Sequence, residues 1–523
     1  MSTTLQYTPI EQIEGIRNEL RAGFASGKLQ SIPYRKYQIT QLIYLVKDNM
    51  TRFEEALKKD LNRPVLESRF LDIIPTITEA VAQLKGVDKW AKPTKPPFSL
   101  NFSAMRPLIR KEPKGTVLVI SPFNYPVWLT LGPLAGAIAA GNTTLLKPSE
   151  STPATSALMT ELVEKYLDKD IVRVVNGAVA ETTKILELQW DHILYTGSGR
   201  VARIVATAAA KHLTPVTLEL GGKSPVVVDP GCDLKTTAHR LLWGKVVNAG
   251  QTCVAPDYIL VPRDFQDKLC DALKEVSLTT MPLATSYAEF YPDGVSSPDS
   301  YSRIVTPQAT ARISGLLERT KGKVVFGGEV DKDNRFIAPT LVRDVPADDS
   351  LMTEEIFGPL LPIVPVDSID DAIKFINARD HPLAVYVFTK DESVKAKVFN
   401  QTQSGGVIAN ETVIHPGVDG MPFGGIGPSG YGQHTGKYTF DMFTHLRTSI
   451  DSPSWVDIIL KFRFPPYTAS KQDQPLRLMG SLPARPKGPP SAVGGKWWAK
   501  WFILALAVAV AGGLTSRLKS SSS

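Results

Sequence analysis

The chain has 523 residues, of which 43% are hydrophobic and 21% charged, and this length favours two or three lobes at roughly 150 residues each, with room for a deep active site. Its formal net charge of +7 is spread along the chain and mixed in sign, which argues against a nucleic-acid-binding protein. The three cysteines, Cys232, Cys253 and Cys270, show no C-x-x-C spacing, so neither a disulfide framework nor a zinc site is indicated and a reducing compartment fits best.

The N-terminal hundred residues predict helices, with a Pro-rich break at 92–97. The first fifteen residues lack a basic stretch followed by an apolar one, so no signal peptide is predicted and the body of the protein is expected in the cytosol.

Between Thr116 and Val228, short β-branched runs alternate with helix-like segments. The expected strands are 115–121, 143–149, 172–177, 191–197 and 214–220, and the expected helices are 131–141, 152–167, 181–189 and 199–213. A second series of strands follows at 258–262, 322–326, 360–366, 384–389 and 406–410. This alternation predicts an α/β protein with two lobes, each built on a parallel doubly wound sheet.

The segment GQTCVAPDY, 250–258, places Cys253 in a loop-like run downstream of ELGGKSP, 219–225. A thiolate is a strong nucleophile, and a carboxylate in a partly apolar pocket can take a proton from the water that cleaves the resulting thioester. Cys253 is therefore a candidate nucleophile and Glu219 a candidate base. A lone cysteine is more often a small buried hydrophobe, but its neighbours argue against that here. Attack by the Cys253 sulfur on a carbonyl carbon produces an oxyanion. Asn124, at the end of an expected strand, is a candidate hydrogen-bond donor to this oxyanion, together with the Cys253 main-chain N–H.

The two segments around Glu219 and Cys253 resemble the aldehyde dehydrogenase superfamily, and their residue sequences are most similar to its fatty-aldehyde, class 3 branch. The resemblance runs from about Tyr34 to Tyr467. It implies the aldehyde dehydrogenase fold, with a Rossmann-like cofactor lobe, a catalytic lobe and an oligomerisation segment, and it makes Asn124 the match to the family's catalytic Asn. Phe123 stands where many relatives have Trp. The glycine-rich run 422–432 resembles a structural motif of the family, and it lacks the ending of a phosphate loop.

Lys147 and Glu150 end an expected strand, where the family has a Lys and a Glu beside the adenosine ribose. A carboxylate at Glu150 accepts from both ribose hydroxyls and repels a 2′-phosphate, which favours NAD over NADP. Class 3 relatives tolerate NADP, so both stay open. Gly197 and Ser198 join a strand to a helix whose N-terminal amides suit a pyrophosphate, although this is a poor dinucleotide fingerprint by itself.

The run EEIFGP, 354–359, resembles a family motif in which the second Glu binds the nicotinamide ribose and the Phe flanks the nicotinamide. The resemblance gives these roles to Glu355 and Phe357. No metal is expected. Oxidation of the aldehyde to the acid through a Cys253 thioester is the implied reaction, with hydride transfer to the cofactor.

The C-terminal part changes character at Arg463, where Pro, Gly, Ser and basic residues predict a linker. Residues 501–514 carry no charge, and Lys500 is the one charged residue within 497–516. About twenty helical residues span about 30 Å of hydrocarbon, so a transmembrane tail anchor is predicted at 497–516. An amphipathic or buried helix is the alternative. The basic flanks fit the endoplasmic reticulum and the mitochondrial outer membrane equally.

The predicted organisation is 1–218 for the N-terminal helices and cofactor lobe, 219–425 for the catalytic lobe, 426–467 for the oligomerisation arm, 468–496 for the linker and 497–516 for the anchor. A membrane-anchored enzyme of this kind implies a lipophilic substrate, either a long-chain fatty aldehyde or a polyene aldehyde such as an apocarotenal, and a homodimer is expected. The alternatives are a catalytically retired NAD-binding or structural relative and an acyl reductase. The joint presence of Cys253, Glu219 and Asn124 argues against the first, and Glu219 argues against the second.

Overall fold

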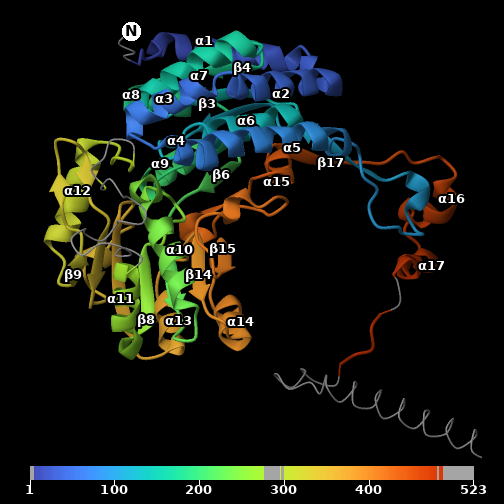
Figure 1. Ribbon diagram of the computed structural model, residues 1–523. Helices are drawn as coiled ribbons and strands as arrows, with labels where there is room; N and C mark the ends of the chain where they lie inside the picture. The colour runs from blue at the N-terminus through green and yellow to red at the C-terminus, as the bar shows by residue number, and fades with distance from the viewer. Residues whose placement is uncertain (1–4, 276–294, 296–299, 480–481, 487–523) are drawn as a thin grey trace, which may run out of the picture. The chain divides into compact units, whose positions relative to one another are not determined.

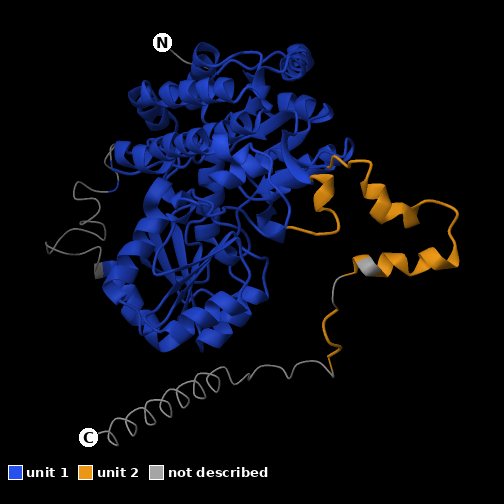
Figure 2. Cartoon of the chain, turned by 90° about the vertical axis from the view of Figure 1, so that its right-hand side faces the viewer, with its two compact units in different colours: residues 1–97, 107–449 blue, residues 98–106, 450–523 orange. Residues whose placement is uncertain are grey.

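The computed structural model describes residues 5–275, 295, 300–479 and 482–486. The chain forms two compact units, Met1–Pro97 with Pro107–Ser449 and Phe98–Arg106 with Ile450–Ser523, which Figure 2 distinguishes by colour. Both sheets with a packed core lie in the first unit.

The N-terminal segment is helical, as predicted. It forms α1 (Ile10–Ala25), α2 (Ile32–Lys47), α3 (Met50–Leu61), α4 (Val65–Ser68), a π-helical turn (Arg69–Ile73) and α5 (Ile74–Trp90). One apolar cluster joins α2, α3 and α5 to α6 (Trp128–Ala140) and α7 (Pro153–Tyr166). Figure 1 shows these helices as a layer over the first sheet.

The first sheet has six strands in the order β16-β6-β5-β2-β3-β4. These are β2 (Thr116–Ile120), β3 (Thr143–Lys147), β4 (Val172–Val174), β5 (His192–Thr196), β6 (Val216–Glu219) and β16 (Gly430–Tyr431). Val117 and Val119 face the α2–α7 side, whereas Leu118 and Ile120 face a cluster with α1, α8 (Val179–Glu187) and α9 (Gly199–Ala210). Because both faces are covered, the strands are continuous apolar runs, and all five predicted strands of this sheet are confirmed.

The second sheet has seven strands in the order β15-β14-β7-β8-β13-β12-β9. They are β7 (Pro225–Val228), β8 (Tyr258–Pro262), β9 (Lys323–Phe326), β12 (Thr340–Arg343), β13 (Leu360–Val366), β14 (Ala384–Phe388) and β15 (Gly406–Ala409). Its helices are α10 (Leu234–Val246), α11 (Gln266–Glu275), α12 (Pro307–Glu318), α13 (Ile369–Asn377) and α14 (Glu392–Gln401). The five predicted strands are confirmed, and β7 and β12 add two that the sequence reading had not singled out.

The parallel sheets predicted from the sequence are confirmed, and an antiparallel strand is added at one edge of each sheet. β16 runs antiparallel to β6, and β9 runs antiparallel to β12. An edge strand has a neighbour on one side only, so its direction follows from how its own loop returns to the sheet rather than from a βαβ crossover.

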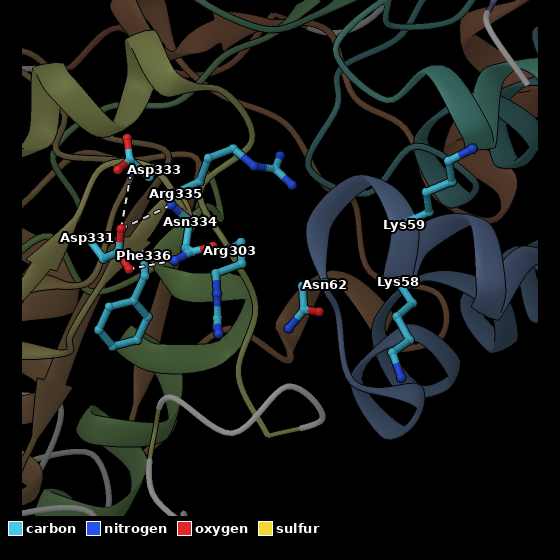
Figure 3. A pocket seen from close by; sticks show the side chains of 9 residues that line it. All are labelled: Lys58, Lys59, Asn62, Arg303, Asp331, Asp333, Asn334, Arg335 and Phe336. Carbon is cyan, nitrogen blue, oxygen red and sulfur yellow. Dashed lines mark hydrogen bonds between the residues drawn. The ribbon is translucent and has the colours of Figure 1, made fainter. Parts of the chain in front are cut away.

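The end of α3 contacts a short antiparallel hairpin, which is formed by β10 (Val330–Asp331) and β11 (Phe336–Ile337). Arg335, in that hairpin, donates from Nη1 to the Asp60 carbonyl oxygen at 3.0 Å and to the Val305 carbonyl oxygen at 2.7 Å. A cavity of about 540 Å³ is lined by residues of both segments, and Figure 3 shows Lys58, Lys59 and Asn62 on one side of it and the hairpin residues on the other. The end of α3 is therefore held against the β10–β11 hairpin.

The remaining regular elements are the antiparallel pair β1 (Leu108–Pro113) and β17 (Thr444–Ser449), and α15 (Lys437–Met442). Short 3₁₀ turns are Lys28–Gln30, Ser103–Met105, Val247–Gly250, Arg263–Phe265, Ser350–Met352, His415–Gly417, Gly427–Ser429, Lys461–Arg463 and Gln474–Leu478.

The second unit holds α16 (Val456–Leu460) and α17 (Ala469–Gln472), around a small cluster of Met105, Val456 and Leu460. Two helical turns, α17 and Gln474–Leu478, thus lie within the segment predicted as a linker. Among the described residues, no helix is long and apolar enough to cross a membrane. The anchor predicted at 497–516 lies outside those residues.

Candidate active site

A cavity of about 850 Å³ opens at the carboxyl ends of β2, β3, β5 and β6, a size typical of ligand pockets. It is lined by all nine residues that the sequence singled out: Asn124, Lys147, Glu150, Gly197, Ser198, Glu219, Cys253, Glu355 and Phe357. These residues come from both halves of the chain, so the fold brings together what the sequence places up to 233 positions apart, between Asn124 and Phe357.

The loop that carries Cys253 has an unusual backbone. Asn248 and Ala249 both have φ of 52°, and Gly250 follows at 73°, so three successive residues are left-handed. A side chain at Gly250 would place its Cβ 2.3 Å from the Gly358 carbonyl oxygen. Residue types other than glycine are strained at such positions and persist when the surroundings hold them there, which is common at functional sites.

The thiol of Cys253 lies among carboxyl groups. Burial raises its pKa well above the usual value, and the charges of Glu219 and Glu355 raise it further. In this structure the thiol is therefore protonated at neutral pH, and the proton must leave before the sulfur can act as a nucleophile.

Glu219 ends β6 and is 1% exposed, and within the described part of the chain neither of its side-chain oxygens has a hydrogen-bond partner. Burial raises its pKa to about 8, and the neighbouring Cys253 thiol opposes that rise. Burial likewise raises the pKa of Glu355 to about 8, with the Asp257 charge adding to it. A carboxyl group that titrates near neutral pH suits proton transfer in both directions.

Asn124 is 2% exposed, and its backbone carbonyl accepts from Asn248 Nδ2 at 3.0 Å. Its side-chain amide makes no hydrogen bond to any described residue, so it is available to a ligand. Next to it, the Phe123 ring meets the Phe357 ring edge-on at 5.7 Å between centroids. The departure from Trp to Phe thus falls on a ring that packs against the residue expected beside the nicotinamide.

The other end of the cavity suits a dinucleotide. Lys147 Nζ and Glu150 Oε2 form an ion pair at 2.6 Å, which presents a donor and an acceptor to ribose hydroxyls. Ser198 precedes α9, and its side chain makes no capping hydrogen bond, so the first amides of the helix are open to an anion. A Cβ on Gly221 would lie 2.3 Å from Glu355 Oε1, so only glycine leaves that carboxylate its place in the wall. The residues present therefore fit a nicotinamide dinucleotide.

Three further residues at the site were missed by the sequence reading, and they hold the loop that bears Glu355 and Phe357. Arg312 donates from Nη1 to Glu354 Oε1 at 3.0 Å and from Nη2 to the Ile356 carbonyl oxygen at 2.6 Å. Lys223 pairs with Asp257, which accepts the Ile356 N–H at 3.0 Å. Lys223 and Asp257 lie inside the two quoted motifs, so a signal for them existed, whereas Arg312 lies in an unremarkable helix.

Residues 3–449 match the family "aldehyde dehydrogenase family". The chain belongs to the aldehyde dehydrogenase family. Membership makes it an oxidoreductase that oxidises aldehydes with a nicotinamide cofactor, as its resemblance implied.

Relatives match over most of their length. The chain is 41% identical to rat aldehyde dehydrogenase family 3 member B1, covering 88% of this chain and 96% of that one. It is 40% identical to mouse family 3 member A2, covering 86% and 91%, and 38% identical to beta-apo-4'-carotenal oxygenase of Neurospora crassa, covering 96% and 92%. These relatives confirm the class 3 resemblance.

Solved structures agree with the fold. Staphylococcus aureus AldH in a substrate-bound state superposes with a TM-score of 0.82 at 39% identity, covering 87% of this chain and 97% of that one. A Mycobacterium tuberculosis aldehyde dehydrogenase complexed with NAD+ gives a TM-score of 0.75 at 26% identity, covering 86% and 92%.

Proposed function

We propose that this enzyme oxidises a long-chain apolar aldehyde to its carboxylic acid, with Cys253 as the nucleophile, Glu219 as the base and Asn124 as an oxyanion donor. The observation that carries the proposal is that one cavity is lined by a thiol, by a buried carboxyl group whose pKa is about 8 and by the Asn124 amide, which has no hydrogen bond to a described residue. Each group is of the type that one step of the reaction needs.

The order of events follows from these groups. The Cys253 thiol gives its proton to solvent water, and the thiolate then adds to the aldehyde carbon. The resulting oxyanion accepts hydrogen bonds from the Asn124 amide and the Cys253 main-chain N–H. A nicotinamide held beside Glu355 and Phe357 would supply the acceptor for the hydride that leaves this carbon. The thioester left on Cys253 is attacked by water that gives its proton to Glu219. The acid departs, and the sulfur is free for another aldehyde.

Residues along the cavity would hold the cofactor. Lys147 and Glu150 would bind the adenosine ribose, Gly197 and Ser198 the pyrophosphate, and Glu355 and Phe357 the nicotinamide end. Glu150 favours NAD, because a carboxylate there repels a 2′-phosphate. A mouse relative named as a dimeric, NADP-preferring aldehyde dehydrogenase, 41% identical to this chain, keeps NADP open and supports a homodimer.

The substrate proposal stays with two classes of aldehyde. Resemblance to class 3 supports a fatty aldehyde, and the printed name of the Neurospora relative supports an apocarotenal. Purified protein is given a panel of aldehydes from six to twenty carbons and one apocarotenal, and NADH formation is followed by absorbance. The class with the larger kcat/KM identifies the substrate, and equal, poor turnover of every long aldehyde would contradict the proposal.

We also propose that 497–516 anchors the enzyme in the endoplasmic reticulum or mitochondrial outer membrane with its catalytic body in the cytosol. Support comes from the uncharged run 501–514 and its basic flanks. The division into 1–218, 219–425, 426–467 and 468–496 is proposed with it.

A single substitution tests the nucleophile. Cys253→Ala should abolish NADH formation while cofactor binding, followed by quenching of protein fluorescence, stays near normal. Cys232→Ala and Cys270→Ala are matched controls that should remain active, because neither sulfur lines the cavity. Residual turnover in Cys253→Ala above a few per cent of the wild type would place the nucleophile elsewhere.

A further inference from the structure

Two loops carry the proposed oxyanion donors, and they come from different sheets. Asn124 follows β2 of the first sheet, and Cys253 precedes β8 of the second. The spacing between the Asn124 amide and the Cys253 main-chain N–H therefore depends on what joins the loops. An oxyanion hole works only when its donors keep that spacing.

Arg63, just after α3, joins them. Its side chain is 0% exposed, and it donates from Nη2 to the Asn124 carbonyl oxygen and, at 2.9 Å, to Asn248 Oδ1. Nε donates to the same Asn248 oxygen at 3.2 Å. One guanidinium thus reaches the backbone of one loop and the side chain of the other.

The remaining guanidinium nitrogen of Arg63, Nη1, forms an ion pair with Asp72 Oδ2 at 3.0 Å. Asp72 Oδ1 in turn accepts the Trp128 N–H at 2.6 Å, at the first residue of α6, which directly follows the Asn124 loop. The guanidinium also lies 5.0 Å from the centre of the Tyr125 ring, and Tyr125 Oη is 2.6 Å from Thr252 Oγ1, next to Cys253.

Asn248 completes the connection from the other side. Its Nδ2 donates to the carbonyl oxygens of Asn124 and Gln251, both at 3.0 Å. Its side chain therefore uses all of its donors and, through Arg63, its acceptor, and these contacts hold Asn248 in its left-handed conformation.

We propose that Arg63 is a positioning residue that sets the spacing of the two oxyanion donors. The inference rests on the proposed function and adds to it a residue that touches neither the aldehyde nor the cofactor. The planar guanidinium suits the role, because its donors diverge in fixed directions toward acceptors on both loops.

The test is the double variant Arg63→Met/Asp72→Asn, which removes the guanidinium together with the charge of its ion-pair partner. Two cofactor-free reactions of Cys253 separate position from folding. Hydrolysis of p-nitrophenyl acetate passes through a tetrahedral oxyanion, whereas alkylation by iodoacetamide does not. We expect kcat for the ester to fall about ten- to a hundredfold, with KM and the alkylation rate changed by no more than about twofold.

Two control variants test whether a fall in kcat comes from loss of the Asp72 charge or from reduced stability of the protein. Asp72→Asn alone keeps the Arg63 donors and should retain kcat within about threefold, and Ile39→Ala, a core truncation in α2, should lower the unfolding temperature without lowering kcat. In an Asn124→Ala background the loss caused by the Arg63 double variant should shrink to about threefold or less, because the position of an absent amide no longer matters. If the Met variant does not fold, Arg63→Gln/Asp72→Asn is measured by the same criteria.

Unchanged kcat in the folded double variant would overturn the inference. So would an equal fall of alkylation and ester hydrolysis, since Arg63 would then support the thiol or the fold, and so would full additivity with Asn124→Ala. The proposed function fails separately, if Cys253→Ala still hydrolyses the ester.

Discussion

Glu219 offers the sharpest test of the chemistry, because its environment predicts both a step and a pH range. Glu219→Gln removes the proposed base and keeps the size of the side chain. Cys253 and Asn124 are untouched, so thiol attack and hydride transfer should continue once per site. The variant should then stall as a thioester, because only hydrolysis needs the base.

The size of the expected pH effect on hydrolysis follows from the burial of Glu219. A carboxyl group whose pKa is about 8 is about one-tenth ionised at pH 7 and about nine-tenths ionised at pH 9. Burial disfavours the charged form, so the base appears only as the pH rises. Hydrolysis of the wild-type acyl-enzyme should therefore accelerate about tenfold from pH 7 to pH 9, whereas in Glu219→Gln it should be slow and nearly flat.

The assay is a rapid mix of enzyme, cofactor and aldehyde, with NADH followed by absorbance and the acyl-enzyme by intact mass. The acyl-enzyme is then transferred to buffers of different pH, and its decay isolates hydrolysis from thiol attack. No NADH burst in Glu219→Gln would mean that Glu219 acts earlier, on the thiol. Wild-type hydrolysis that does not change between pH 7 and pH 9 would refute the reasoning from burial.

Three further outcomes are expected. Asn124→Ala should lower kcat about a hundredfold with little change in KM, as for loss of one oxyanion donor, and steady-state kinetics in which KM alone suffers would show that its role is misassigned. Glu150→Ala should raise kcat/KM for NADP relative to NAD, because the carboxylate that repels a 2′-phosphate is gone; an unchanged ratio would place the selectivity elsewhere. Deletion after Gly495 should give an active enzyme in the soluble fraction, while the intact protein should resist alkaline carbonate, and stripping of the intact protein by carbonate would rule out a spanning anchor.

The regular elements were largely predictable because strands buried on both faces are local apolar runs. Every strand expected in 116–220 and after Cys253 appears within a few residues. The edge strand β16 was not predictable, since two residues of a glycine-rich run carry no periodicity, and its pairing of Gly430 with Glu219 depends on the returning chain. The antiparallel direction of β9 was not predictable either, because its partner strand β12 was not evident from the sequence.

The sequence by itself determined the chemistry of the site: a thiol, a carboxylate and an amide in motifs specific enough to indicate an aldehyde dehydrogenase. Only the tertiary structure decided how those groups behave. The raised pKa of Glu219 arises from its burial, and burial is the sum of contacts from many segments. Arg63 lies in the loop after α3 and Arg312 lies in α12, and neither segment carries a motif. Their partners are 61 and 42 positions away, at Asn124 and Glu354. Such contacts depend on how helices pack on sheets, which no local pattern of residues encodes.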